Sequence, residues 1–143
     1  MPYRYLEEIA TADIAFEAWA DTLQDLFIVS SDALVNVMVE DLDTIKKTES
    51  KVLRSKNIAI DLLLFDVLQE IIYYKDAFRL ILRLDSAEIE ENNGEFFFEG
   101  TASGELIDPQ RHRLAADVKA VTLHQFRLDS REGVWNVHVV LDI

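Results

Sequence analysis

The sequence NIAIDLLLFDVLQEIIYY at residues 57–74 has the period of a helix with one buried face. Its apolar positions recur every three or four residues, at Ile58, Leu62, Phe65, Leu68, Ile71 and Ile72. Asn57 is a suitable N-cap for this helix, which we expect to end near Tyr74. Residues 78–91 instead contain alternation between apolar and polar side chains, and Asn93-Gly94 then favours a hairpin turn into the next strand. A helix followed by hairpins is the pattern that decides the fold.

A second helical pattern lies earlier in the chain, from Thr22 to Val39. Its apolar residues again keep the helical spacing, and Asp21-Thr22 offers an N-cap, with Gln24 and Asp25 three residues beyond each. We expect three more extended segments in the first half, at Tyr3–Glu8, at Ile14–Trp19 and, as a polar edge strand, at Glu49–Ser55.

The last third of the chain reads as a loop followed by a hairpin. Asp108-Pro109 opens an irregular polar loop that extends to Ala116. A long strand from Val118 to Asp129 and a turn at residues 130–133 lead into a final strand, Val134–Ile143. Because helices fill much of the first half and hairpins the second, we predict an α+β fold with two helices packed on a largely antiparallel sheet.

Composition narrows the class of protein. The chain has 143 residues, which fits a single domain over residues 1–143, and it has no cysteine. The absence of cysteine excludes a disulfide framework, a thiolate zinc site and a catalytic cysteine. The first residues lack the apolar run of a signal peptide, and no stretch has the ~20 apolar residues of a membrane-spanning helix. We therefore expect a cytoplasmic protein without a membrane partner.

The charge balance bears on the partners of the protein. With 27 acidic and 14 basic residues the formal net charge is −13, and the basic residues form only one loose cluster. Nucleic-acid binding depends on Lys and Arg that neutralise phosphates, so we expect no strong direct binding of nucleic acid. A surface this acidic suits a freely soluble protein, a basic protein partner, or the capture of a cation.

Two carboxylates could come together at the end of the chain. A final strand that stays apolar to Ile143 should be docked, and the α-carboxylate of a natural C-terminus would then lie one residue beyond the Asp142 carboxylate. Carboxylate and main-chain oxygens are the ligands of a hard divalent cation such as Ca²⁺, if a third acid lies nearby. Alternatively, Asp142 only caps the strand end. Asp13, between two extended segments, is by itself most simply a turn or cap residue.

Other residues give weak evidence for catalysis. His112, His124 and His138 are too dispersed for a metal motif, and no Ser or Thr nucleophile motif or Gly-rich phosphate loop occurs. Lys119 is a lone base at the head of an alternating strand, a position where most lysines face solvent.

Several short segments together resemble the archease family. They are spread in the right order over the whole chain, and the total length also agrees: Thr11–Trp19, Asp21–Phe27, Gly104-Glu105, Asp108–His112, Asp117–His124 and Val140–Ile143. One segment departs from the family pattern Leu-x-His-Thr-Ala-Asp. Here Glu7-Glu8-Ile9-Ala10 stands between Leu6 and Thr11, so the histidine is missing and two residues are added, while Asp13 keeps its match.

The resemblance implies a non-enzymatic activator of the tRNA-splicing RNA ligase of the RtcB type. Such a ligase joins RNA ends with GTP and Mn²⁺ through a guanylylated histidine of its own, and the archease promotes that guanylylation and multiple turnover. The resemblance further implies a divalent-cation site, seen with calcium, at Asp13, Asp142 and Ile143, and a role in activation for Lys119.

Two alternatives remain open from the residues themselves. Asp13 and Asp142 as paired carboxylates would suit a metal-dependent hydrolase such as a phosphohydrolase. A general chaperone-like binding module is the other alternative, and it predicts activity on unrelated clients.

Overall fold

Two antiparallel sheets enclose a pair of helices in the computed structural model, which describes residues 2–6 and 12–143. The elements are β1 (Tyr3–Tyr5), β2 (Asp13–Ala20), α1 (Leu23–Met38), the 3-10 turn η1 (Leu42–Thr44), β3 (Glu49–Asn57), α2 (Ile60–Phe78), β4 (Leu80–Leu84), β5 (Glu88–Asn92), β6 (Glu95–Leu106), β7 (Ala120–Arg131) and β8 (Val134–Asp142). The first sheet has the order β1-β2-β8-β7; the second has the order β3-β6-β4, with β5 also pairing with β6.

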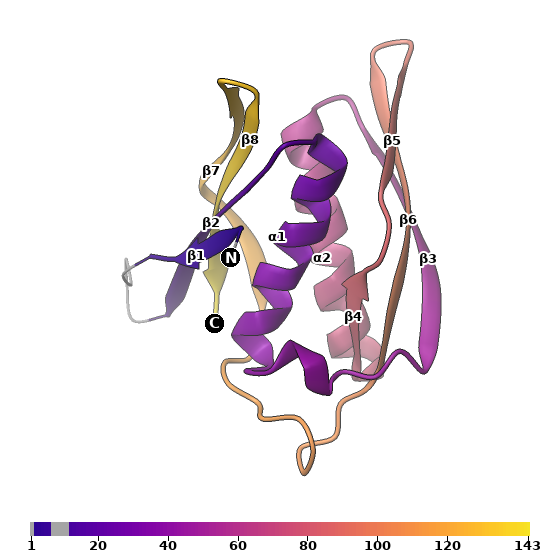
Figure 1. The fold of residues 1–143 in the computed structure, drawn as a ribbon, viewed down its shortest axis with the longest axis vertical. Coiled ribbons are helices and arrows are strands. Elements are labelled where there is room, and N and C mark those ends of the chain that lie inside the picture. The colour runs from indigo at the N-terminus through magenta and orange to yellow at the C-terminus, as the bar shows by residue number, and fades with distance from the viewer. Residues whose placement is uncertain (1, 7–11) are drawn as a thin grey trace.

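The helices lie between the two sheets (Figure 1). Helix α1 contacts β2 of the first sheet and β4 of the second, and α2 contacts β7 as well as β3 and β4. The predicted α+β class of two helices on antiparallel strands is therefore confirmed, but the strands form two sheets rather than one. The reason lies in the helices: α1 buries the consecutive residues Ala33, Leu34 and Val35 completely, so it has apolar contacts on more than one face.

The helix starts depend on local hydrogen bonds. Of the two residues predicted to cap α1, Thr22 is the N-cap, and its side chain accepts a hydrogen bond from the Asp25 N–H at 3.1 Å. The N-cap predicted for α2 is wrong: Asn57 is the last residue of β3, and the helix begins at Ile60 with Ala59 as its N-cap. The Asn57 side chain instead accepts from the Ala59 N–H at 3.1 Å, which shapes the turn before the helix.

Helix α2 also runs further than predicted, to Phe78. It ends where Arg79 adopts a left-handed conformation with φ of 54°. The alternating stretch after it is not one strand but two, β4 and β5, which both pair with β6 on either side of a break at residues 85–87. The hairpin turn is confirmed, because Asn93 and Gly94 have φ of 54° and 78°.

The remaining strands agree with the patterns apart from their bounds. Strand β3 is an edge strand as predicted, and the loop before β7 is irregular. Strand β7 starts at Ala120 rather than Val118, and its register with β8 shifts between Thr122 and Arg127. Strand β1 ends at Tyr5, whereas the predicted continuation through Glu7-Glu8 lies outside the described residues. No helix in the described part of the chain is long and apolar enough to cross a membrane.

Candidate functional site

The pairing of β2 with β8 places the first and last acidic residues of the predicted site opposite each other. Asp13 is the direct cross-strand partner of Asp142, and both are half-buried. Directly opposite side chains in an antiparallel pair lie on the same face of the sheet, with Cβ atoms about 4.5–5.5 Å apart. The structure therefore brings together two carboxylates from nearly opposite ends of the chain.

Apolar pairing explains why both carboxylates turn away from the helices. The pairs Phe16↔Val139 and Ala18↔Val137 belong to the core between sheet and helices. Because side chains alternate along a strand, this register places Asp13 and Asp142 on the other face of the sheet. A slip of either strand by one residue would turn its carboxylate toward the core, so the core fixes the geometry of the acidic pair.

Ile143 also lies at the end of the first sheet where Asp13 faces Asp142, which we call the corner at Asp13 and Asp142. Its N–H donates to the carbonyl oxygen of Ala12 at 2.8 Å, and its side chain packs against the core. The main-chain oxygen of residue 143 thus lies beside the strand end that carries Asp13.

Lys119 lies at this corner, immediately before the first residue of β7. Its N–H donates to the main-chain oxygen of Asp142 at 2.8 Å, and the next residue, Ala120, is the cross-strand partner of Asp142. The side chain of Lys119 is exposed, and no ion pair involves it among the described residues. The four residues singled out from the sequence therefore meet at one end of the first sheet.

A buried lysine that the sequence did not single out holds the segment before Lys119. The Nζ of Lys75, only 7% exposed in the last turn of α2, lies 2.6 Å from the Asp117 carboxylate and 2.7 Å from the Val118 carbonyl oxygen. It also lies 2.6 Å from the Asp76 carboxylate. The Lys75 ammonium thus holds Asp117 and Val118, the two residues before Lys119, and so determines where β7 begins. The Lys75 contact joins residues far apart in the chain, so no local pattern could have revealed it.

A second buried polar cluster anchors the loop between β6 and β7. The Glu105 carboxylate accepts hydrogen bonds from the Arg111 guanidinium and, at 2.7 Å, from the Lys46 N–H. His112, 1% exposed, accepts from the Asp108 N–H at its Nδ1, so its Nε2 carries the proton and donates to Glu105 at 2.9 Å. His112 thus has a structural role, and the other two histidines lie elsewhere on β7 and β8.

The charge of Glu105 is stabilised by this cluster. The Arg111 guanidinium lowers the pKa of the Glu105 carboxyl to about 2, with the Lys46 N–H and His112 adding to the effect, while burial acts in the opposite direction. The Glu105 carboxylate is therefore ionised at neutral and mildly acidic pH.

We expect Glu105→Gln to lower the free energy of unfolding by about 1.5–3 kcal/mol near neutral pH, the contribution of a hydrogen bond to a charged group. The pKa of Glu105 is lower in the folded protein than in the unfolded chain, so its contribution is present above about pH 4.5 and is lost toward pH 2. Urea unfolding at several pH values should show that the free energies of unfolding of the variant and of the unsubstituted protein converge as the pH falls below about 4.5.

Glu99→Gln is the matched control, since Glu99 lies on the same strand but is exposed and, in the described part of the chain, pairs with Arg54 alone. It should change the free energy of unfolding by less than about 1 kcal/mol. An equal loss in both variants, or a Glu105→Gln loss that does not shrink in acid, would contradict this assignment.

The corner at Asp13 and Asp142 brings together two carboxylates from β2 and β8. Neither carboxylate has an ion-pair partner in the described part of the chain, and like charges directly opposite in a sheet destabilise it. No group of three or more His, Cys, Asp or Glu side chains that could hold a metal occurs among the described residues. A cation here would therefore take two side-chain carboxylates, with main-chain oxygen at Ile143 or water completing its shell.

Known proteins share both the sequence and the fold. Residues 3–143 match the archease protein family (MTH1598/TM1083). The chain is 34% identical over 142 residues to protein archease of Methanosarcina mazei, across 99% of this chain and 95% of that protein. It is 32% identical over 144 residues to protein archease of Methanopyrus kandleri, across 100% of both.

Two solved structures are also similar. The solution structure of Methanobacterium thermoautotrophicum protein 1598 has a TM-score of 0.85 at 26% identity, over 99% of each chain. The crystal structure of an archease from Thermotoga maritima, described as a possible chaperone, has a TM-score of 0.63 at 19% identity. It covers 96% of this chain and 97% of that one, and it shows the fold alone.

The fold and the corner at Asp13 and Asp142 define a small α+β protein with paired acidic strand ends. The match over residues 3–143 and the identity to curated relatives then decide the family. The chain belongs to the archease family.

Proposed function

We propose that this protein activates a tRNA-splicing RNA ligase of the RtcB type without being an enzyme itself. It promotes guanylylation of the ligase and so allows repeated turnover in tRNA splicing and RNA repair in the cytoplasm. Membership of the archease family along nearly the whole chain is the observation that supports this proposal most strongly. The motifs that carry the family resemblance include the segments of Asp13, Lys119 and Asp142, which meet at one end of the first sheet.

In this proposal, the corner at Asp13 and Asp142 holds a calcium ion, which is bound by the two carboxylates and the main-chain oxygen of Ile143. These donors are hard oxygens, which suit Ca²⁺ and are also accepted by Mg²⁺ and Mn²⁺. A bound cation would offset the repulsion between the two facing carboxylates and fix the strand ends of β2 and β8 together.

The ligase, and not the RNA, is the direct partner. A net charge of −13 favours contact with a basic protein surface and disfavours binding to the phosphate backbone of RNA. Lys119 is an exposed cation whose main chain bonds to Asp142, and an ammonium in that place can pair with a phosphate or a carboxylate of the ligase–nucleotide complex.

We expect Lys119→Ala to slow guanylylation of the purified ligase at least about tenfold while leaving the fold intact, because the side chain is exposed and only its backbone bonds to β8. Labelled GTP transfer to the ligase measures the rate, and thermal unfolding checks the fold. Arg131→Ala is the matched control: it removes one exposed positive charge from the opposite end of β7 and should leave the rate unchanged. A normal rate for Lys119→Ala would exclude its role.

The same assays separate the alternatives. A metal-dependent hydrolase would cleave a phosphate ester in the absence of ligase and lose that activity with a chelator. A general chaperone would suppress aggregation of unrelated clients. The proposed activator does neither, and its effect depends on the presence of the ligase.

A further inference from the structure

The second sheet carries the one basic segment of this acidic chain. Five of the 14 Lys and Arg residues fall between Lys46 and Lys56, where Glu49 is the only acid: they are Lys46, Lys47, Lys51, Arg54 and Lys56. The structure places three of these, Lys51, Arg54 and Lys56, on β3, and the side chains of all three are exposed. A chain with net charge −13 thus presents a positive strand on the sheet that lies away from Asp13 and Asp142.

Strand β3 is also an open edge. It pairs with β6 along its whole length, and no other strand among the described residues pairs with its second side. A nine-residue edge strand leaves a row of N–H and C=O groups that can pair with another extended chain. In Figure 1 the strand runs along the outer side of the molecule, and α2 contacts it from the inner side.

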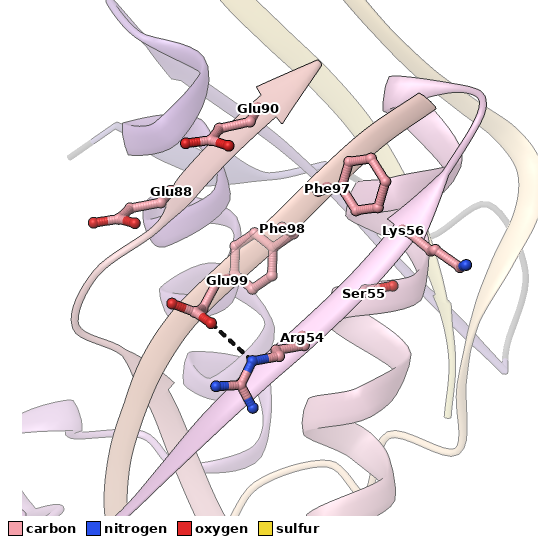
Figure 2. Close-up of a pocket in the computed structure, with 8 residues that line it drawn as sticks. All are labelled: Arg54, Ser55, Lys56, Glu88, Glu90, Phe97, Phe98 and Glu99. Carbon is pink, nitrogen blue, oxygen red and sulfur yellow. Dashed lines mark hydrogen bonds and ion pairs between the residues drawn. The ribbon is translucent and has the colours of Figure 1, made fainter. Parts of the chain in front are cut away.

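The side chains on the solvent face of this edge are arranged by charge. Arg54 and Lys56 lie directly opposite Glu99 and Phe97 of β6, which in turn lie opposite Glu88 and Glu90 of β5. Figure 2 shows the basic pair and the acidic pair on either side of β6. An open hollow of about 450 Å³ lies between them, and Phe97 on its floor is 39% exposed.

The cations on this face are only partly neutralised. Arg54 forms an exposed ion pair with Glu99 at 2.7 Å, whereas Lys56 has no ion pair among the described residues. Exposed pairs of this kind contribute little to folding. The basic side chains of β3 are therefore available to an incoming partner at small cost to the protein itself.

We propose that β3 accepts an extended acidic segment of a partner protein as an added strand of the second sheet. The spacing of Arg54 and Lys56 defines the chemistry of that segment. The two residues are separated by one position and share a face, so the partner needs acidic side chains at alternate positions, as in Glu-x-Glu. Backbone hydrogen bonds would supply much of the affinity and the charges would supply specificity.

Charge argues for this occupant over the others. Two β3 edges pairing with each other would set Arg54 and Lys56 against like charges, and the net charge of −13 opposes close association of two copies. A nucleic acid could not pair with the N–H and C=O groups on the open side of the strand, which only another extended polypeptide can do. The proposal does not depend on the ligase or on the corner at Asp13, because it concerns the other sheet.

Two peptides of identical composition test the proposal with the full-length protein. EVETEVE presents its glutamates at alternate positions, and EEEEVTV presents them in a block. Binding is followed by amide chemical shifts of the ¹⁵N-labelled protein and by hydrogen exchange of the β3 amides. We expect EVETEVE to shift and protect β3 resonances at submillimolar to millimolar concentration, and EEEEVTV to bind at least about fivefold more weakly.

The double variant Arg54→Gln/Lys56→Gln should weaken binding of EVETEVE about five- to tenfold, as expected for two exposed ion pairs. Arg127→Gln/Arg131→Gln, on the other sheet, should leave it unchanged. Thermal unfolding checks that both variants fold. No shift in β3, equal binding of both peptides, tighter binding of oligouridylate than of EVETEVE, or self-association of the protein through β3 would each overturn the proposal.

Discussion

Replacing Gly104 with alanine should destabilise the protein by about 3 kcal/mol or more, the upper end of the range for an overpacked core. Gly104 lies on the central strand β6, opposite Glu49 of β3 on one side and Leu82 of β4 on the other. A Cβ atom here would overlap the carbonyl oxygen of Ile81, which is backbone and cannot rotate away.

The backbone cannot relieve this clash without losing buried contacts. Moving β4 away from β6 would expose Leu80, Leu82 and Leu84, which are at most 4% exposed. A shift of β6 instead would displace Glu105, the next residue of that strand, from Arg111 and His112. Since whole domains are stable by only about 5–15 kcal/mol, the change should be visible as a large fall in the urea midpoint.

Gly133→Asn is the control for Gly104→Ala. Gly133 has φ of 79° in the β7–β8 turn, with nothing within 4 Å of an added Cβ, and asparagine tolerates this conformation. The control should cost about 1 kcal/mol or less. A Gly104→Ala protein as stable as the Gly133→Asn control would show that the packing of β4 on β6 is looser than described.

The second large effect concerns Asp142. In the proposed cation site, Asp142→Asn removes one of only two side-chain carboxylates while preserving the shape of the residue. Loss of an outer-shell partner already costs about 10- to 100-fold in metal affinity, so we expect at least that loss for a direct ligand. Calcium titration by calorimetry measures it, and activation of ligase guanylylation should fall in parallel.

Without calcium, Asp142→Asn should be slightly more stable than the unsubstituted protein. Asp13 then faces an amide rather than a second negative charge. The rise in melting temperature that calcium gives the unsubstituted protein should disappear in the variant. This reversal of order with and without calcium distinguishes a lost ligand from a damaged fold.

Asp21→Asn provides a matched control, because Asp21 is an exposed carboxylate just beyond the other end of β2. It should bind calcium and activate as the unsubstituted protein does. If Asp142→Asn loses calcium yet activates normally, the cation has no part in activation. If it binds calcium normally, Asp142 is a strand-end cap and the site lies elsewhere.

Local sequence signals predicted the elements well where the cause is local. Thr22 caps α1 because its side chain reaches the Asp25 N–H three residues away, and Asn93-Gly94 turns because both residues accept a positive φ. The Asn57 N-cap was a local prediction that failed. Its side chain serves the turn at Ala59 instead, and the helix begins after it.

What the sequence could not reveal depends on contacts between distant segments. Division of the strands into two sheets follows from helices that bury several faces, and a periodic apolar pattern does not say how many layers it meets. The pairing of Asp13 with Asp142 and the hydrogen bond from Lys75 to the Val118 carbonyl oxygen likewise join residues far apart in the chain. The family resemblance named Asp13, Asp142, Ile143 and Lys119, but nothing in it or in the local pattern singled out Lys75.

The central claim, activation of an RNA ligase, is tested most directly by ligation with the ligase limiting and RNA in excess. We predict that the purified ligase alone stops near one product per enzyme, and that this protein at substoichiometric concentration allows many turnovers. Heat-denatured protein should have no effect. The same product yield with and without the folded protein would contradict the account.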